Sequence, residues 1–228
     1  MDFAGAFTFA FQDTNWIKKV GLAALIFLIP VVGQIIVIGW GLEITRRVIN
    51  NETELLPDWN DFGGYLSKGF QGFVVTLAFS LPALLINICQ QGLTYGINAA
   101  ANNSNSGNIA AVAGFGAICL GCLSFIFSLA AGFLTPAALG SLAESGQLSA
   151  AFNFNRVIGL VRSALGPYLL QMLVTGVAGV ILMPLGLIVC IIGVFFAFAY
   201  LTTISYHLTG QSYKIASAAL GASAANTF

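Results

Sequence analysis

Long apolar runs alternate with short polar and charged segments along this chain. No Asp, Glu, Lys or Arg occurs between Lys68 and Glu144, and none occurs between Arg162 and Lys214. An ionisable group at the bilayer centre costs about 2.5 to 3.5 kcal/mol on insertion scales, so charge-free runs are where a chain crosses a membrane. Each run is long enough for two helical spans of about 20 residues. The pattern therefore predicts two transmembrane hairpins.

An earlier apolar run, Val20 to Trp40, is interrupted by Pro30 and Gly33. Proline removes a backbone donor and kinks or ends a helix, so two arrangements fit: one kinked span, or a short hairpin that turns over Pro30 to Gly33. Basic pairs flank the run on both sides: Lys18 and Lys19, and Arg46 and Arg47. Because basic flanks stay on the cytoplasmic side, the hairpin is favoured. Its arms are short, and a re-entrant turn must be shielded by protein or water.

A polar connection, residues 49–61, follows the first run. Asp58 is suited to cap a helix that begins at Trp59, with Asp61 in its first turn. Apolar side chains then recur at spacings of three and four, which predicts an amphipathic helix lying in the membrane interface. The first long span is expected over residues 71–89, with a kink near Pro82.

Residues 90–108 are rich in Asn, Gln, Ser and Gly and carry no charge, which predicts a polar extracytoplasmic loop. The chain is expected to return over residues 109–134, with Pro136 marking the end of that helix. Ala117 and Gly121 lie four residues apart in this span. Small residues at that spacing let a neighbouring helix approach closely.

The last third of the chain repeats this layout. Ser149 is suited to cap a short amphipathic helix, and the apolar run from Pro167 to Tyr206 is twice the length of one span. The sequence from Met183 to Gly186, with Pro184 inside it, predicts the turn of a further hairpin. His207 would then lie past the end of the last span.

Together these segments predict an all-α polytopic transmembrane bundle of three helical hairpins, the first short or re-entrant, with interfacial amphipathic helices. We expect one integral membrane domain over residues 1–228, divided into 1–48, 49–140 and 141–228. The alternation places every Lys and Arg on one side, so both termini are expected in the cytoplasm. The predicted location is a cell membrane, inner or internal, crossed several times.

Composition agrees with this prediction. The chain is 58% hydrophobic and 7% charged, and its mean hydropathy is +0.91, whereas soluble domains contain about 25% charged residues. The formal net charge is zero, and no nucleic acid partner is predicted. The four cysteines all lie in apolar runs, which favours core packing over disulfides.

The sequence contains little that suggests chemistry. Cys119 and Cys122 form a C-x-x-C pair in an apolar span without a neighbouring His, so a four-ligand metal site cannot be filled there. His207, the single histidine, could ligate a porphyrin or chlorin metal, although an interfacial residue near lipid head groups is the ordinary interpretation. Gln171 and other uncharged polar residues in the spans suit interhelical hydrogen bonds. We expect no enzyme activity, no resident cofactor beyond bound lipid, and no metal.

Several short blocks resemble a family of small prokaryotic membrane proteins, the domain-of-unknown-function family numbered four thousand and thirteen. The blocks are Trp16 to Lys19, Ile29 to Gly33, Arg46 with Arg47, Leu55 to Phe62, Lys68 with Gly69, and Tyr206 to Tyr213. The resemblance implies a multi-helix membrane protein and no assigned activity. It is strongest over residues 13–90.

Two functions compete on these observations. The first is an accessory or scaffold subunit of a larger membrane complex, with membrane lipids and other membrane protein subunits as partners. The alternative is a passive or lipid-handling membrane carrier in which prolines act as hinges. The residues expected to matter for structure or interfaces are Pro30, Gly33, Pro57, Trp59, Asp61, Ala117, Gly121 and Pro184.

Overall fold

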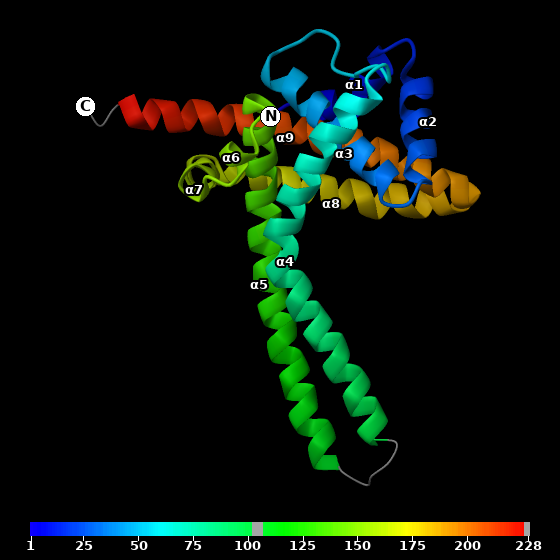
Figure 1. Cartoon of the computed structure of the whole chain (residues 1–228), viewed down its shortest axis with the longest axis vertical. Coiled ribbons are helices and arrows are strands. Elements are labelled where there is room, and N and C mark those ends of the chain that lie inside the picture. Colours follow the sequence, from blue (N-terminus) through cyan, green and yellow to red (C-terminus); the bar gives the residue numbers. More distant parts are fainter. Residues whose placement is uncertain (102–106, 226–228) are drawn as a thin grey trace. The chain divides into compact units, whose positions relative to one another are not determined.

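A computed structural model describes residues 1–101 and 107–225, and the chain is helical through most of that part (Figure 1). The elements are α1 (Phe3–Gln12), α2 (Trp16–Phe27), α3 (Val32–Ile49), α4 (Phe62–Ala101), α5 (Gly107–Ser145), α6 (Leu148–Ala151), α7 (Phe154–Ser163), α8 (Leu165–Ile188) and α9 (Cys190–Ala225). No β-strand occurs within the described ranges. The predicted all-α fold class is confirmed.

Within the described residues, four helices contain segments that are long and apolar enough to cross a membrane. They are Phe62–Gly96, Gly114–Ser145, Leu165–Ile188 and Ile192–Ala222. Each exceeds the length of about 20 residues that a hydrocarbon core of about 30 Å requires. The chain is therefore a polytopic protein of the membrane type, as the charge-free runs predicted.

The first apolar run forms a hairpin, not one kinked span. Helix α2 ends at Phe27 and α3 begins at Val32. Between them Val31 has a φ of +64°, and its neighbours close a tight turn in which the Val32 amide donates to the Pro30 carbonyl over 2.7 Å. A Cβ at Gly33 would collide with the carbonyl oxygen of Ile26. Only glycine allows the two arms to approach this closely at their junction.

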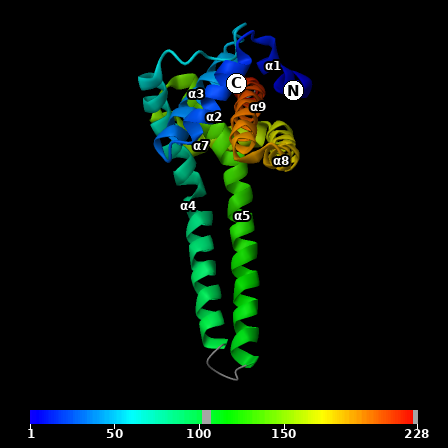
Figure 2. The ribbon, with the colours of Figure 1, turned by 90° about the vertical axis from the view of Figure 1, so that its right-hand side faces the viewer.

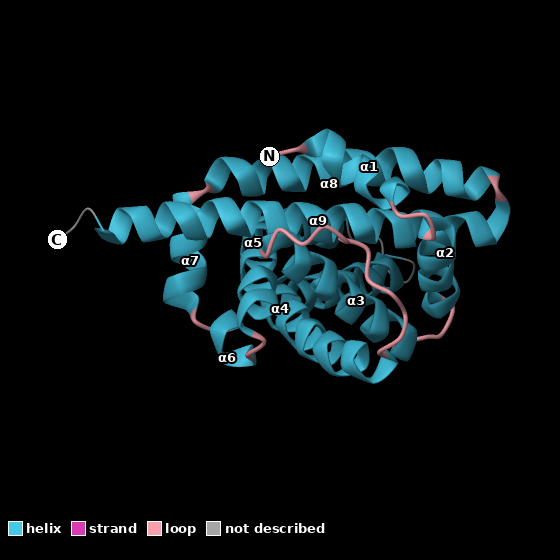
Figure 3. Ribbon diagram, turned by 90° about the horizontal axis from the view of Figure 1, so that it is seen from above, coloured by secondary structure: helices cyan, strands magenta, loops and turns pink. Residues whose placement is uncertain are grey.

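The last hairpin also forms, but its turn lies further along the chain than predicted. Pro184 lies inside α8, and the helix ends only at Ile188. The arms meet at Gly186 and Gly193, where a Cβ on Gly186 would lie 2.8 Å from the Gly193 carbonyl oxygen. Helices α8 and α9 then run side by side (Figure 3). The close glycine contact, and not the proline, determines where the chain reverses.

Three further boundary predictions are wrong. Helix α4 continues through Pro82 to Ala101, so no separate interfacial helix precedes the span. Helix α5 begins at Gly107 and continues through Pro136 to Ser145. Most of the loop predicted over residues 90–108 is therefore helical, and residues 102–106 lie outside the described part. A proline inside a membrane helix frees few backbone groups, which local adjustment can satisfy again.

Two helix caps also differ from the prediction. Asp61, not Asp58, caps α4, because its Oδ1 accepts from the Gly64 amide over 2.8 Å. Ser149 lies inside the short α6, and α7 is capped by Asn153, whose side chain accepts from the Arg156 amide over 3.2 Å. In both cases the cap is the polar residue directly before the helix.

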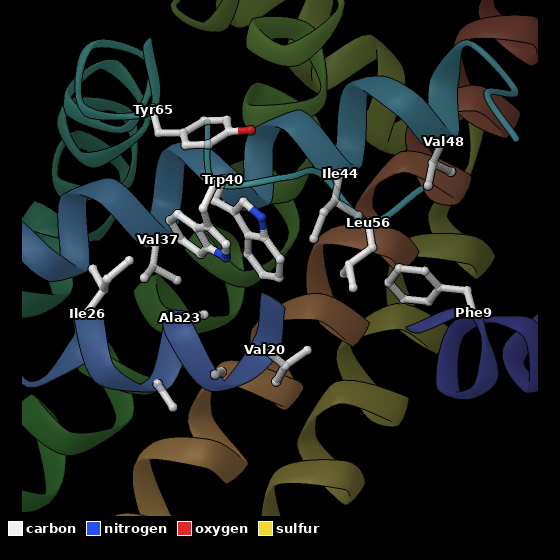
Figure 4. Close-up of a cluster of buried hydrophobic side chains, with 13 residues drawn as sticks. Phe9, Val20, Ala23, Ile26, Val37, Trp40, Ile44, Val48, Leu56 and Tyr65 are labelled. Atoms are coloured by element: carbon white, nitrogen blue, oxygen red, sulfur yellow. The ribbon is translucent and has the colours of Figure 1, made fainter. Parts of the chain in front are cut away.

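The chain divides into two compact units. Unit 1 comprises Met1–Thr76 with Phe133–Phe228, and unit 2 comprises Leu77–Gly132. The core of unit 1 gathers apolar side chains from α1, α2, α3, α9 and the connection before α4 (Figure 4). At its centre Trp40 stacks on Trp59, with ring centroids 5.2 Å apart.

Unit 2 is a hairpin made from the second half of α4 and the first part of α5, which run alongside one another (Figures 1 and 2). The Gln90 amide donates to the Ala117 carbonyl over 3.4 Å, and the position of a Cβ on Gly121 is 3.7 Å from the same amide nitrogen. The small residues singled out in α5 thus face α4. Aliphatic and aromatic side chains dominate the exposed surface of this unit.

Candidate functional site

Three consecutive backbone carbonyls in the connection before α4, those of residues 56–58, each accept a hydrogen bond from a different helix. The donors are Lys19 Nζ of α2 to Leu56 at 3.0 Å, Trp40 Nε1 of α3 to Pro57 at 3.0 Å, and Tyr65 Oη of α4 to Asp58 at 2.6 Å. We call this arrangement the loop clamp. Because buried carbonyls need partners, it allows an irregular segment to lie against the core.

Trp59, a residue of the same loop, donates a hydrogen bond back to α2. Its indole Nε1 donates to the Lys19 carbonyl over 2.8 Å, and its ring lies between Trp40 and Phe62. The Pro57 carbonyl, Trp59 and the cap residue Asp61 therefore belong to one structural feature. These three residues stand close together in the sequence, but the contacts that fix the loop come from residues distant in the chain.

Lys19 is held between two carboxylates. Its ammonium contacts Asp13 at 2.5 Å and Asp58 at 2.9 Å, in addition to the Leu56 carbonyl. Burial would lower the pKa of this ammonium, but the hydrogen bonds to both aspartates outweigh burial and raise the pKa. A polar cavity of about 360 Å³ lies beside it. Lys19 therefore stays protonated and is unsuited to act as a nucleophile or base.

A second polar feature, the ion-pair cluster, surrounds Glu43 of α3. This carboxylate is only 7% exposed and contacts three cations: Arg46 at 2.6 Å, Arg47 at 3.5 Å and Lys68 at 2.9 Å. Burial would raise the pKa of Glu43, but hydrogen bonds from Arg46 and Lys68 outweigh burial and lower the pKa to about 2. Glu43 is thus a fixed anion at neutral pH and cannot exchange protons as a general base.

The stretch Tyr206–Tyr213 of α9, here called the α9 contact segment, touches α3 and α1 on one side. Thr45 donates to the Tyr206 carbonyl over 2.9 Å, and a Cβ on Gly210 would lie 2.7 Å from Cβ of Val48. Gln211 exchanges two hydrogen bonds with the backbone of Asp2, at 2.8 and 3.0 Å. The N-terminal helix is thereby fastened to α9.

The same segment also touches α8, α5 and α7. Gln171 of α8 donates to Thr209 over 2.7 Å, which confirms the expected interhelical bond. Tyr213 donates to Glu144 over 2.7 Å and accepts from Arg156 over 3.0 Å. Eight consecutive residues therefore connect five helices of unit 1.

His207 lies inside unit 1, contrary to the prediction that it follows the last span. It is 5% exposed and stacks on Phe9, with ring centroids 4.4 Å apart. Its Nδ1 lies 3.2 Å from the Gln211 amide. Phe9 covers one ring face and Nδ1 lies beside the Gln211 amide, so ligation of a porphyrin metal through this side chain stays a prediction. The side chain is packed within the segment Ile192–Ala222.

Three buried polar atoms on α8 have no hydrogen-bond partner within the described part of the chain: Tyr168 Oη, Gln171 Oε1 and Thr175 Oγ1. At spacings of three and four they share one face of the helix. Elsewhere in the described ranges, no three His, Cys, Asp or Glu side chains gather to hold a metal ion. Cys119 and Cys122 are free and exposed.

Sequence analysis missed the residues that make the two polar features work, above all Glu43, Trp40 and Tyr65. One local signal was present for Glu43. It precedes Arg46 and Arg47 by three and four residues, the spacing at which helical side chains form ion pairs. No local signal could identify the loop clamp, because its donors and acceptors are distant in the sequence.

The comparisons with known proteins agree with the resemblance found in the sequence. A family profile described as "Protein of unknown function (DUF4013)" matches residues 22–191, about three quarters of the chain. The match includes the first hairpin turn, the ion-pair cluster and the Leu55 to Phe62 block, and it ends before the α9 contact segment. No curated protein and no solved structure matches the chain.

Proposed function

Since the chain belongs to the DUF4013 family, whose members are described as proteins of unknown function, we propose its role from its own surface. The proposed role is a non-enzymatic accessory or scaffold subunit of a larger membrane complex. Its partners are membrane lipids and other membrane protein subunits.

The outer half of α4 in unit 2 carries this proposal. Gly92 and Gly96 are exposed, and a Cβ on either would meet no atom within 4 Å. The amide side chains of Asn87 and Gln91 are exposed on the same half of the helix, on a different face from the two glycines. Glycines four apart let membrane helices approach closely, so the face that carries Gly92 and Gly96 is suited to a helix from another subunit.

The charged groups of unit 1 support a non-enzymatic role. Lys19 and Glu43 are held in their charged forms by ion pairs, and neither is available for proton transfer at neutral pH. Both polar features hold the fold together, so neither needs a substrate to explain it. Bound lipid is the expected companion of the apolar surface, and we propose no resident cofactor.

The distribution of charge supports a topology. All eight Lys and Arg residues lie in unit 1, whereas unit 2 contains no charged residue. Following the positive-inside rule, we propose that the charged parts of unit 1 and both termini face the cytoplasm and that the hairpin end of unit 2 faces away from it. The membrane would be a cell membrane, inner or internal.

Mild extraction and native electrophoresis test the subunit role. The wild-type chain should migrate in a complex larger than itself, and the double variant Gly92→Leu with Gly96→Leu should shift to the size of the free chain. Gly176→Leu on α8 is the matched control, because that glycine is also exposed with open space around it. A wild-type chain that runs only as a monomer after the mildest extraction would refute the proposal.

A second role, a passive or lipid-handling carrier, is favoured by one observation. Two apolar hollows of about 480 and 370 Å³ lie in unit 1 beside α8, and both are lined by Leu182. Their linings are almost entirely hydrocarbon, which suits acyl chains. Liposomes containing the purified chain should then exchange lipid or solute faster than empty liposomes. Equal rates would exclude this role and leave the subunit proposal untouched.

A further inference from the structure

The turn of the α2–α3 hairpin presents an apolar tip. Five aliphatic side chains around it are between 48% and 62% exposed: Leu25, Leu28, Ile29, Val31 and Val32. Between Lys19 and Glu43 the sequence has no charged residue, and the one polar side chain close to the turn is the neutral amide of Gln34. An aliphatic surface of this kind is unfavourable in water and needs a cover.

Several backbone amides of the tip donate to its own carbonyls. The amides of Leu28 and Ile29 donate to Leu25 and Ile26 over 3.2 and 2.9 Å, and the Gly33 amide donates to Ile29 over 3.1 Å. Pro30 has no amide hydrogen. A turn in hydrocarbon is tolerated only when its polar groups are paired, and these bonds pair several of them without water or a second protein.

Charged groups mark where the hairpin leaves the apolar region. On α2 the first charge is Lys19, paired with Asp13 and Asp58, and on α3 it is Glu43, within the ion-pair cluster. From these two residues to the turn, the arms contain only eight residues of α2 and eleven of α3. At about 1.5 Å per residue, each arm reaches about 12 to 17 Å. The hydrocarbon core is about 30 Å thick, so the tip reaches its middle and cannot cross it.

We propose that the α2–α3 hairpin inserts into a single leaflet of the bilayer, on the side that carries the charged residues of unit 1, with its tip near the midplane. The occupant of the tip surface is lipid and not a protein partner. The exposed side chains are Leu, Ile and Val, whereas the residues that anchor protein interfaces are chiefly Trp, Tyr and Arg. The inference does not depend on the subunit role, because it concerns the isolated chain in lipid.

Site-specific labelling in proteoliposomes tests this inference. In a chain whose four native cysteines are replaced by serine or alanine, Asn15→Cys and Asn50→Cys probe the two ends of the hairpin, and Val31→Cys probes the tip. A membrane-impermeant maleimide should label positions 15 and 50 from the same side. A fluorophore at position 31 should be quenched several-fold more by lipids with a nitroxide near the chain end than by lipids with one near the head group.

Three results would overturn the inference. Labelling of positions 15 and 50 from opposite sides would show a full span. Rapid labelling of position 31 by the impermeant reagent would show a tip in water. Stronger quenching by the nitroxide near the head group would show a hairpin lying at the interface. If Val31→Cys fails to insert, Ile29→Cys probes the same turn and the same three results apply.

Discussion

The two units are built on opposite principles. Unit 1 contains every charged residue of the chain, and its helices cross at glycines whose Cβ positions are filled by neighbouring backbone. Unit 2 has no charge, and several of its glycines face open space. Specific polar contacts and close packing therefore determine the structure of unit 1. Unit 2 needs little beyond two apolar helices and a lipid environment, which leaves its surface available for other helices.

The largest difference between the two units is expected in how much a glycine substitution lowers the free energy of unfolding. Gly39 lies against α4, where a Cβ would collide with the Tyr65 carbonyl and lie 2.8 Å from the Gly69 amide nitrogen. Gly39→Val should destabilise unit 1 by about 3 kcal/mol or more, because neither helix backbone can yield easily. All three tryptophans lie in unit 1, so thermal unfolding in detergent followed by tryptophan fluorescence measures the effect.

Gly92→Val in unit 2 is the matched substitution. Its side chain enters open space, and we expect its free energy of unfolding to stay within about 0.5 kcal/mol of wild type. Far-ultraviolet circular dichroism, which reports the helices of both units, is the measurement for this variant. Equal destabilisation by the two variants would show that the close glycine contacts of unit 1 do not distinguish the units.

The next largest effect is expected in the ion-pair cluster. Glu43→Gln leaves Arg46, Arg47 and Lys68 without their shared carboxylate. Removing one partner of a buried pair costs 3 to 5 kcal/mol, and we expect about 3 kcal/mol because the cations are partly exposed. Glu144→Gln is the control: its pair with Arg156 is exposed on both sides and should contribute less than about 1 kcal/mol. The free energy of unfolding of both variants is measured in urea. Equal losses would show that the ion-pair cluster stabilises the fold no more than an exposed ion pair does.

Acid should weaken unit 1 through the same carboxylate. The pKa of Glu43 is lowered from its ordinary value of 4.5 to about 2 on folding, so its stabilising effect is complete above pH 4.5 and is lost as pH falls toward 2. We expect a loss of about 2 kcal/mol across that window, after allowance for solvent screening. The Glu43→Gln variant should lose correspondingly less over the same range, and an unchanged acid response in that variant would assign the effect to other groups.

The smallest effect is expected from loss of the hydrogen bond between Trp40 and the Pro57 carbonyl. Trp40→Phe keeps an aromatic ring in the core but removes the donor to the Pro57 carbonyl, and we expect a loss of about 1 to 2 kcal/mol. Tyr95→Phe in unit 2, where the side chain is 74% exposed, should change stability little. Protease cleavage within residues 50–61 should be faster in the Trp40 variant, whereas an unchanged rate would mean that the loop is held without this bond.

Charge placement predicted the architecture well, because the cost of ionic groups in hydrocarbon is large compared with helix propensity. The charge-free runs identified all four spanning segments, and the basic pairs beside Lys19 and Arg46 identified the first hairpin. Proline was a poor guide inside the spans. Pro136 and Pro184, which were expected to end or turn a helix, lie within helices, since a membrane helix has no better alternative for its backbone groups.

For the loop clamp, the sequence indicated which residues matter but not which contacts they make. Pro57, Trp59 and Asp61 were recognised from a short block, but their roles depend on residues brought close by the fold. The Pro57 carbonyl needs Trp40, and the Asp58 carbonyl needs Tyr65. Asp58, the predicted cap, instead pairs with Lys19. Such pairings are set by helix crossings, which a single sequence does not specify.

The α9 contact segment has a consequence for biosynthesis. It joins α1, α3, α5, α7 and α8, yet it emerges from the ribosome after all of them. During translation the earlier helices would therefore reach the membrane before the residues that connect them exist. A nascent chain halted before Tyr206 would have its first three spans complete, while the last span and the Gln211 anchor of the N-terminal helix were still missing. Quality-control proteases would then meet a half-assembled chain until the last helix is delivered.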